Sequence, residues 1–75
     1  MTMIIAVPSH VIDTAVSAVL SATPRRRRLT LAGQSAAFIA NLSEQGFPDQ
    51  VARGYGISFE RAVLARVEAA GGGLQ

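Results

Sequence analysis

Apolar residues recur at helical spacing in the first half of the chain, and polar residues occupy the positions between them. Ser9 is the expected N-cap of this segment. Thr23-Pro24 follows it, and a residue before proline is disfavoured in helical conformation. The pattern therefore predicts an amphipathic helix over 10–22. Its apolar face comprises Val11, Ile12, Ala15, Val16, Val19 and Leu20.

The opening run 3–7 is apolar, rich in branched side chains and stopped by Pro8. It is too short for periodicity to assign. Two interpretations remain open: a strand paired with a second copy of the chain, or an extended arm lying on the helices. Together with the helix over 10–22, this run is more apolar than one small C-terminal unit can cover, which favours a homodimer.

The second half shows three further helical segments. Thr30 is the expected cap of a helix reaching Gln45, with Gly46 in the stop position. A short helix from Pro48 ends at Gly56, and Ser58 caps a last helix that runs to about residue 70. The chain is thus predicted to be all-α. The expected core consists of Leu31, Phe38, Ile39, Leu42, Val51, Ala52, Tyr55, Ile57, Phe59 and Val67.

The stretch PDQVARGYGISFERAVLARVE, residues 48–68, resembles a bacterial helix-turn-helix. Such motifs have a small residue in the first helix, a turn glycine, an apolar residue after it and a capping Ser or Thr. Ala52, Gly56, Ile57 and Ser58 stand at these places. The resemblance implies a trihelical, homeodomain-like unit over 30–70 whose last helix lies in the major groove of duplex DNA.

The helix that this resemblance assigns to base reading is unusually apolar. The motif's alignment directs Phe59, Val63 and Leu64 outward, although polar side chains normally read base edges. The motif also has Ala62 where a branched apolar residue is usual. A helix exposing such a patch is suited to contact with a protein, whereas burial of these residues would leave DNA as the partner.

Charge adds a second functional signal. All seven basic residues are arginines, four of them in the unbroken run 25–28, and His10 is the only histidine. A basic run of this kind binds an anionic partner or forms a solvated linker. Placed ahead of a helical unit, it resembles the homeodomain arm, whose arginines enter the minor groove.

Composition excludes several other functions. The absence of Cys removes a disulfide framework, a thiol nucleophile and a Cys-ligated metal site. The five acidic residues lack the paired spacing of a general acid and base, and Asp49 and Arg53 form an i,i+4 helical pair instead. We therefore expect no enzymatic activity, no cofactor and no metal. No segment has the composition of a secretory signal or a membrane span, so we expect a cytoplasmic protein.

These observations divide the chain into a dimerising arm and helix over 1–24, a basic linker over 25–29, the trihelical unit over 30–70 and a flexible tail over 71–75. The function they favour is a small DNA-binding transcriptional regulator of bacterial, plasmid or phage type. The alternative is a phage or plasmid inhibitor that binds a protein partner through its last helix. The expected DNA-binding residues are Arg25, Arg26, Arg27, Arg28, Arg53, Ser58, Glu60, Arg61 and Arg66, with Leu64 also near base edges.

Overall fold

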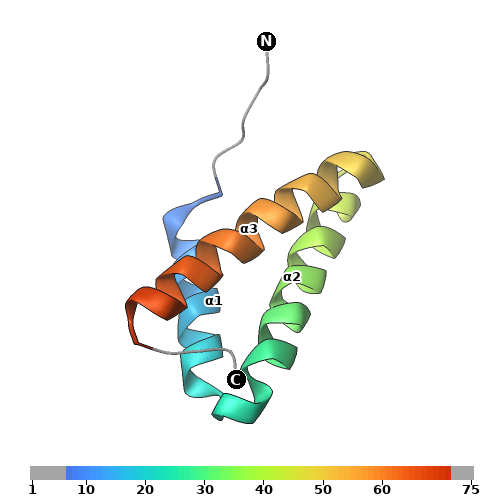
Figure 1. Cartoon of the computed structure of the whole chain (residues 1–75). Helices are drawn as coiled ribbons and strands as arrows, with labels where there is room; N and C mark the ends of the chain where they lie inside the picture. Colours follow the sequence, from blue (N-terminus) through green and yellow to red (C-terminus); the bar gives the residue numbers. More distant parts are fainter. Residues whose placement is uncertain (1–6, 72–75) are drawn as a thin grey trace.

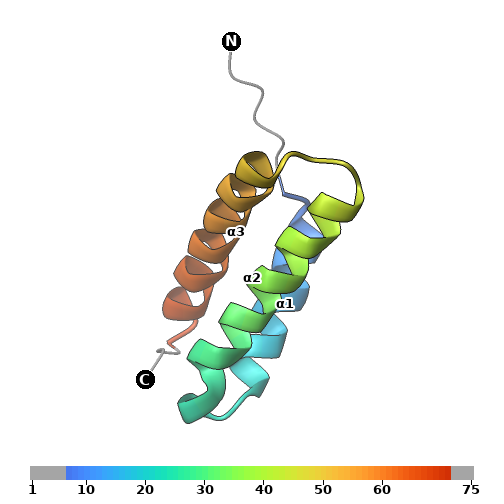
Figure 2. The ribbon, with the colours of Figure 1, turned by 90° about the vertical axis from the view of Figure 1, so that its right-hand side faces the viewer.

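A computed structural model describes residues 7–71, and these residues confirm the all-α prediction (Figure 1). Its elements are α1 (Ser9–Ser21), the 3-10 turn η1 (Pro24–Arg26), α2 (Arg27–Glu44) and α3 (Asp49–Ala69). Figure 2 shows α2 and α3 side by side and antiparallel, and α1 packs against both. Residues 3–6 of the predicted strand or arm, and most of the predicted tail, lie outside the described residues.

Helix α1 lies within one residue of its predicted bounds, but its apolar face is partly covered by the chain itself. Ala15, Val16 and Val19 are buried and form one core cluster. The remaining members of that cluster are Leu31, Phe59, Val63 and Val67. Helices α2 and α3 therefore bury part of this face within one chain, while Val11, Ile12 and Leu20 are only half-buried. The homodimer itself stays a prediction.

The connection between α2 and α3 follows the predicted stop at Gly46. This glycine has a φ of 99°, a left-handed conformation that side chains with a Cβ rarely adopt. The Gly46 N–H donates to the Ser43 carbonyl and the Phe47 N–H donates to the Leu42 carbonyl, both at 3.1 Å. This is the hydrogen-bond pattern of a Schellman motif, so local sequence ends α2 and reverses the chain.

The predicted turn at Gly56 is wrong, because α3 continues through it without interruption. Gly56 is buried, and a Cβ built there would lie 2.5 Å from Ile39 Cγ1 and 2.6 Å from Ile39 Cδ1. The glycine therefore serves the close approach of α2 and α3 rather than a reversal of the backbone. Ser58 is an exposed residue inside the helix and not a cap, so the helix-turn-helix is not formed.

The continuous helix also decides which predicted core residues are buried. Ile57 and Val51 are 53% and 40% exposed, because an unbroken α3 turns them away from α2. The prediction for these two residues is wrong. Burial is confirmed for Leu31, Ala52, Phe59 and Val67, while Phe38, Ile39, Leu42 and Tyr55 are half-buried.

Two glycines of α3 provide a matched test of the crossing. A Cβ at exposed Gly54 meets nothing within 4 Å, so Gly54→Ala should raise the free energy of unfolding by about 0.5–1 kcal/mol through helix propensity. Gly56→Ala should lower it by about 1–3 kcal/mol, the usual effect of overpacking, because Ile39 has one strongly preferred rotamer in a helix. Urea denaturation followed by circular dichroism measures both. Equal stabilisation by the two substitutions would show that α2 and α3 do not meet at Gly56.

Candidate nucleic-acid interface

The four consecutive arginines form the corner between α1 and α2 and not a linker. Thr23 has extended backbone ahead of Pro24, and the Arg26 N–H donates to the Thr23 carbonyl at 2.8 Å to close the 3-10 turn. Helix α2 then begins at Arg27, three residues before the predicted cap Thr30. The corner lies at the bottom of Figure 1, where α1 ends and α2 begins. The backbone therefore holds the basic run in helical turns, and the linker predicted over 25–29 is wrong.

Three of these arginines are available to a ligand. Arg25, Arg26 and Arg28 are exposed. Their side chains make no ion pair or hydrogen bond with any residue that the structure describes. The first turn of α2 contains no acidic residue, and residues 14–43 contain no Asp or Glu at all. The positive charge of this corner is thus not neutralised by neighbouring residues of either helix.

Arg27 has a different, structural position. It is half-buried, and its Nε donates to the carbonyl of Ala22, the C-cap residue of α1, at 3.3 Å. A cation near a helix C-terminus is favourable because the last carbonyls there lack helical partners. Arg27 therefore fastens the end of α1 to the start of α2, and the other three arginines project from the corner that it holds.

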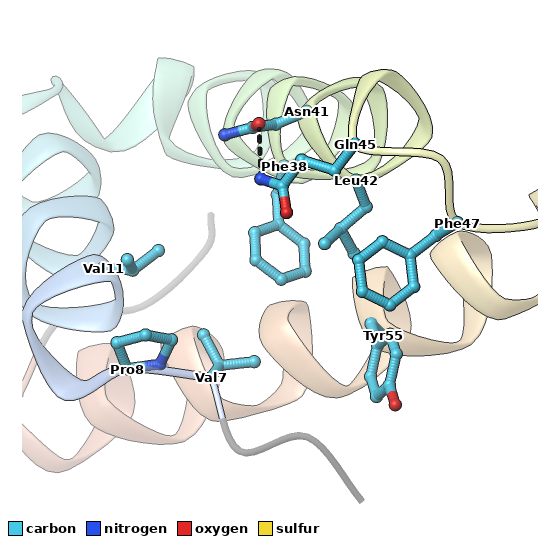
Figure 3. A pocket seen from close by; sticks show the side chains of 9 residues that line it. All are labelled: Val7, Pro8, Val11, Phe38, Asn41, Leu42, Gln45, Phe47 and Tyr55. Atoms are coloured by element: carbon cyan, nitrogen blue, oxygen red, sulfur yellow. Dashed lines mark hydrogen bonds between the residues drawn. The ribbon is translucent and has the colours of Figure 1, made fainter.

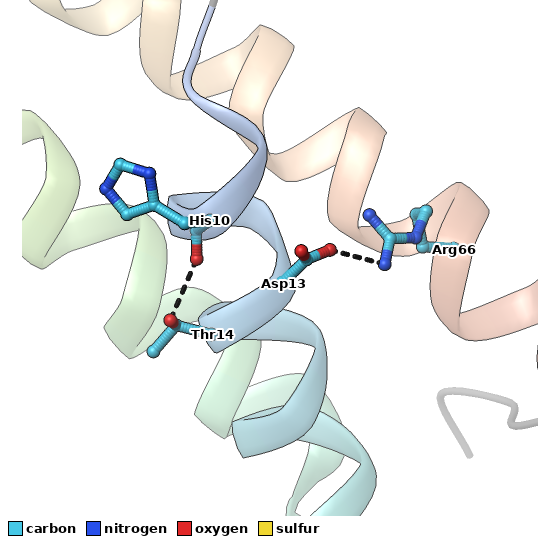
Figure 4. Close-up of polar contacts among 4 residues, drawn as sticks. All are labelled: His10, Asp13, Thr14 and Arg66. Carbon is cyan, nitrogen blue, oxygen red and sulfur yellow. Dashed lines mark hydrogen bonds and ion pairs between the residues drawn. The ribbon is translucent and has the colours of Figure 1, made fainter.

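Two of the arginines predicted to bind DNA, Arg53 and Arg66, form ion pairs within the chain. Arg66 Nη2 lies 2.6 Å from Asp13 Oδ1 and joins α3 to α1 (Figure 4). Arg53 Nε lies 3.0 Å from Asp49 Oδ2, the i,i+4 pair expected from the sequence. Arg53 is also remote from the arginine corner. It lies near the start of α3, beside the C-terminal end of α2, and α2 is about 27 Å long.

The remaining predicted DNA contacts lie along the middle of α3. Ser58, Glu60 and Arg61 are exposed on the outer side of a helix packed lengthwise against α2. No separate recognition helix begins at Ser58, so the geometry that was to carry these residues into a major groove is absent from residues 49–69. The structure does not bring them together with the arginine corner.

The apolar surface considered for a protein partner is largely internal. Phe59 is 2% exposed and Val63 is fully buried, while Leu64 is half-buried against the core. The Phe59 ring stacks on Phe38, with centroids 4.5 Å apart and ring planes inclined by 8°. The outward direction assigned to these residues by the helix-turn-helix alignment is wrong, because the exposed side of a continuous α3 is a different side.

Comparison with known proteins gives no match: no family model, no curated protein and no solved structure is significantly similar to the chain. Within residues 7–71, no group of His, Asp and Glu side chains is arranged to hold a metal ion. None of the described helices combines the length and the apolar character needed to cross a bilayer. The arginine corner is the strongest candidate site that the described residues offer.

The different positions of Arg27 and Arg28 lead to a prediction about stability. Arg27→Ala should lower the free energy of unfolding by about 0.5–1.5 kcal/mol, the usual net contribution of one hydrogen bond. Arg28→Ala should not lower it, since removing a cation from the positive end of α2 relieves repulsion. Chemical denaturation of the two variants measures the difference. An equal decrease in the free energy of unfolding in the two variants would show that Arg27 is no more important for stability than Arg28.

Proposed function

We propose that the protein binds duplex DNA through phosphate contacts of Arg25, Arg26 and Arg28. The observation that carries this proposal is the presence of three exposed arginines, without an acidic partner, at the N-terminal end of α2. A helix N-terminus carries partial positive charge and favours anions. The cluster and the helix dipole therefore attract the same kind of ligand.

The unfavourable electrostatics of the free protein support an anionic partner. Like charges next to one another repel, and each is also repelled by the positive end of α2. Nothing in residues 14–43 relieves this repulsion, because that stretch has no carboxylate. Natural sequences tend to retain such local conflicts at functional sites. A bound polyanion removes the conflict by supplying the missing negative charges.

Arginine chemistry favours phosphate in particular. The planar guanidinium presents parallel N–H donors that match two oxygens of one phosphate group. Arg25 lies in η1 and Arg28 lies in the first turn of α2, so both stand at the same corner of the bundle. Contacts of this kind fix a protein on the duplex but carry no base information. Binding would therefore be largely independent of the DNA sequence. The transcriptional role expected from the amino-acid sequence stays a prediction.

No observation favours the alternative of a protein-binding last helix. That hypothesis required Phe59, Val63 and Leu64 to form an exposed patch, and the first two are buried. The exposed apolar residues Leu29, Val51 and Ile57 belong to different parts of α2 and α3. Single exposed apolar residues are common on protein surfaces and do not mark an interface.

The salt dependence of binding tests the proposal with matched variants. Each phosphate contact contributes about 0.9 to the slope of log K against log salt, so Arg25→Gln with Arg28→Gln should make the slope shallower by roughly 2. Arg53→Gln with Arg61→Gln removes the same net charge from α3 and should leave the slope nearly unchanged. Fluorescence anisotropy of a labelled duplex, titrated at several salt concentrations, gives both slopes.

Two results would contradict DNA binding at this corner. One is the absence of any association of the wild-type protein with duplex DNA at low salt. The other is an equal change of slope in the two double variants, because binding would then follow net charge rather than the position of the arginines.

A further inference from the structure

The positive charge of the chain is concentrated at one end of the bundle. The chain has a net charge of +2 at pH 7, and four of its seven arginines belong to the run 25–28. The rest of the chain contains three arginines and all five acidic residues, so that part is net negative. A polyanion is therefore attracted to the arginine corner and repelled, on balance, by the remainder of the protein.

Each arginine outside the run 25–28 has an acidic neighbour. The three pairs are the ion pairs of Asp13 with Arg66 and of Asp49 with Arg53, and the sequence neighbours Glu60 and Arg61. The two acidic residues left over are Glu44, in the last turn of α2, and Glu68, in the last turn of α3. Neither forms an ion pair with a residue that the structure describes. These two glutamates therefore add negative charge where no arginine balances it.

The two glutamates lie at opposite ends of the bundle. Helices α2 and α3 are antiparallel and meet where Gly56 faces Ile39. Both helices rise by about 1.5 Å per residue, so Glu68, twelve residues after Gly56, is level with Arg27, twelve residues before Ile39. Figure 2 shows the end of α3 and the start of α2 at the same end of the bundle. Glu44 closes the other end of α2, about 27 Å away.

The end of the bundle that carries Glu44 is unsuited to phosphate. Arg53 lies there, but it is paired with Asp49 at 3.0 Å. Beside them is a cavity of about 270 Å³, which Figure 3 shows between α1, α2 and α3. Its lining residues, among them Phe47 and Tyr55, are uncharged. This end therefore combines unbalanced negative charge with an uncharged hollow.

We propose that the protein binds duplex DNA end-on, with the arginine corner and the last turn of α3 against the phosphates and the end that carries Glu44 pointing away. This inference rests on the proposed function. In the end-on orientation Glu68 lies beside the bound phosphates and weakens binding by repelling them. A bundle lying lengthwise on the duplex would instead bring the acidic residues of the opposite end toward the DNA, at an electrostatic cost.

Two substitutions that make the same chemical change test this orientation. Glu68→Arg and Glu44→Arg each replace an exposed acid by a base in the last turn of a helix, where a cation is favourable, so neither should impair folding. Glu68→Arg should add one phosphate contact, which steepens the slope of log K against log salt by about 0.9 and raises DNA affinity on the order of 5-fold at about 0.1 M salt. Glu44→Arg should change the affinity less than about 2-fold, because its distance from the arginine corner exceeds the screening length of about 10 Å at this salt concentration. Fluorescence anisotropy of a labelled duplex measures both affinities.

Nuclear magnetic resonance of the wild-type protein locates the contact without any substitution. Backbone amide signals of residues 24–29 and 66–70 should shift when duplex DNA is added to nitrogen-15-labelled protein, and those of residues 44–53 should not. Equal gains in affinity in the two variants, no gain from Glu68→Arg, or shifts concentrated at residues 44–53 would overturn the end-on orientation while leaving DNA binding intact. Failure of the wild-type protein to bind any duplex at low salt would overturn DNA binding itself, and the orientation with it.

Discussion

The close approach of α2 and α3 at Gly56 is the constraint on which the rest of the structure depends. The missing Cβ leaves room for Ile39, which would otherwise meet it at 2.5 Å. Three residues further along α3, Phe59 stacks on Phe38 and continues the same contact. Glycine inside a helix lowers its stability by roughly 0.5–1 kcal/mol relative to alanine, so its presence at Gly56 is explained by packing and not by propensity. With α3 seated in this way, Val63 and Val67 reach the buried face of α1.

The two ends of the bundle differ in charge and polarity. At one end Arg27 ties α1 to α2 through the Ala22 carbonyl, and the neighbouring arginines are left without acidic partners. At the other end the Schellman turn at Gly46 brings Phe47 against Tyr55 and leaves an uncharged cavity beside Val7. One end is therefore basic, and the other is lined by uncharged residues. The outer side of α3, where Glu60 and Arg61 are exposed, belongs to neither end.

The helix-turn-helix interpretation failed at one residue for a definite physical reason. Glycine is favoured both where a chain must turn and where two helices must cross closely, and sequence spacing does not distinguish the two situations. Ser58 strengthened the first interpretation, because serine is a common N-cap but is also tolerated on the exposed side of a helix. Only the position of Ile39 on α2 shows that Gly56 belongs to a crossing. The same ambiguity explains why the sequence predicts a core position for Ile57, which is exposed.

The sequence by itself determined the features that depend on neighbouring residues. The helical periodicity of 10–22, the stop at Gly46, the Asp49–Arg53 pair and the concentration of charge at 25–28 all follow from local spacing and side-chain chemistry. The tertiary structure decided what depends on contacts between distant segments. It buried Ala15, Val16 and Val19 of α1 against α2 and α3, and it joined Arg66 to Asp13. Within the run 25–28, it separated the half-buried Arg27 from the three exposed arginines. Such contacts link residues far apart in the chain, and no local pattern specifies which segments meet.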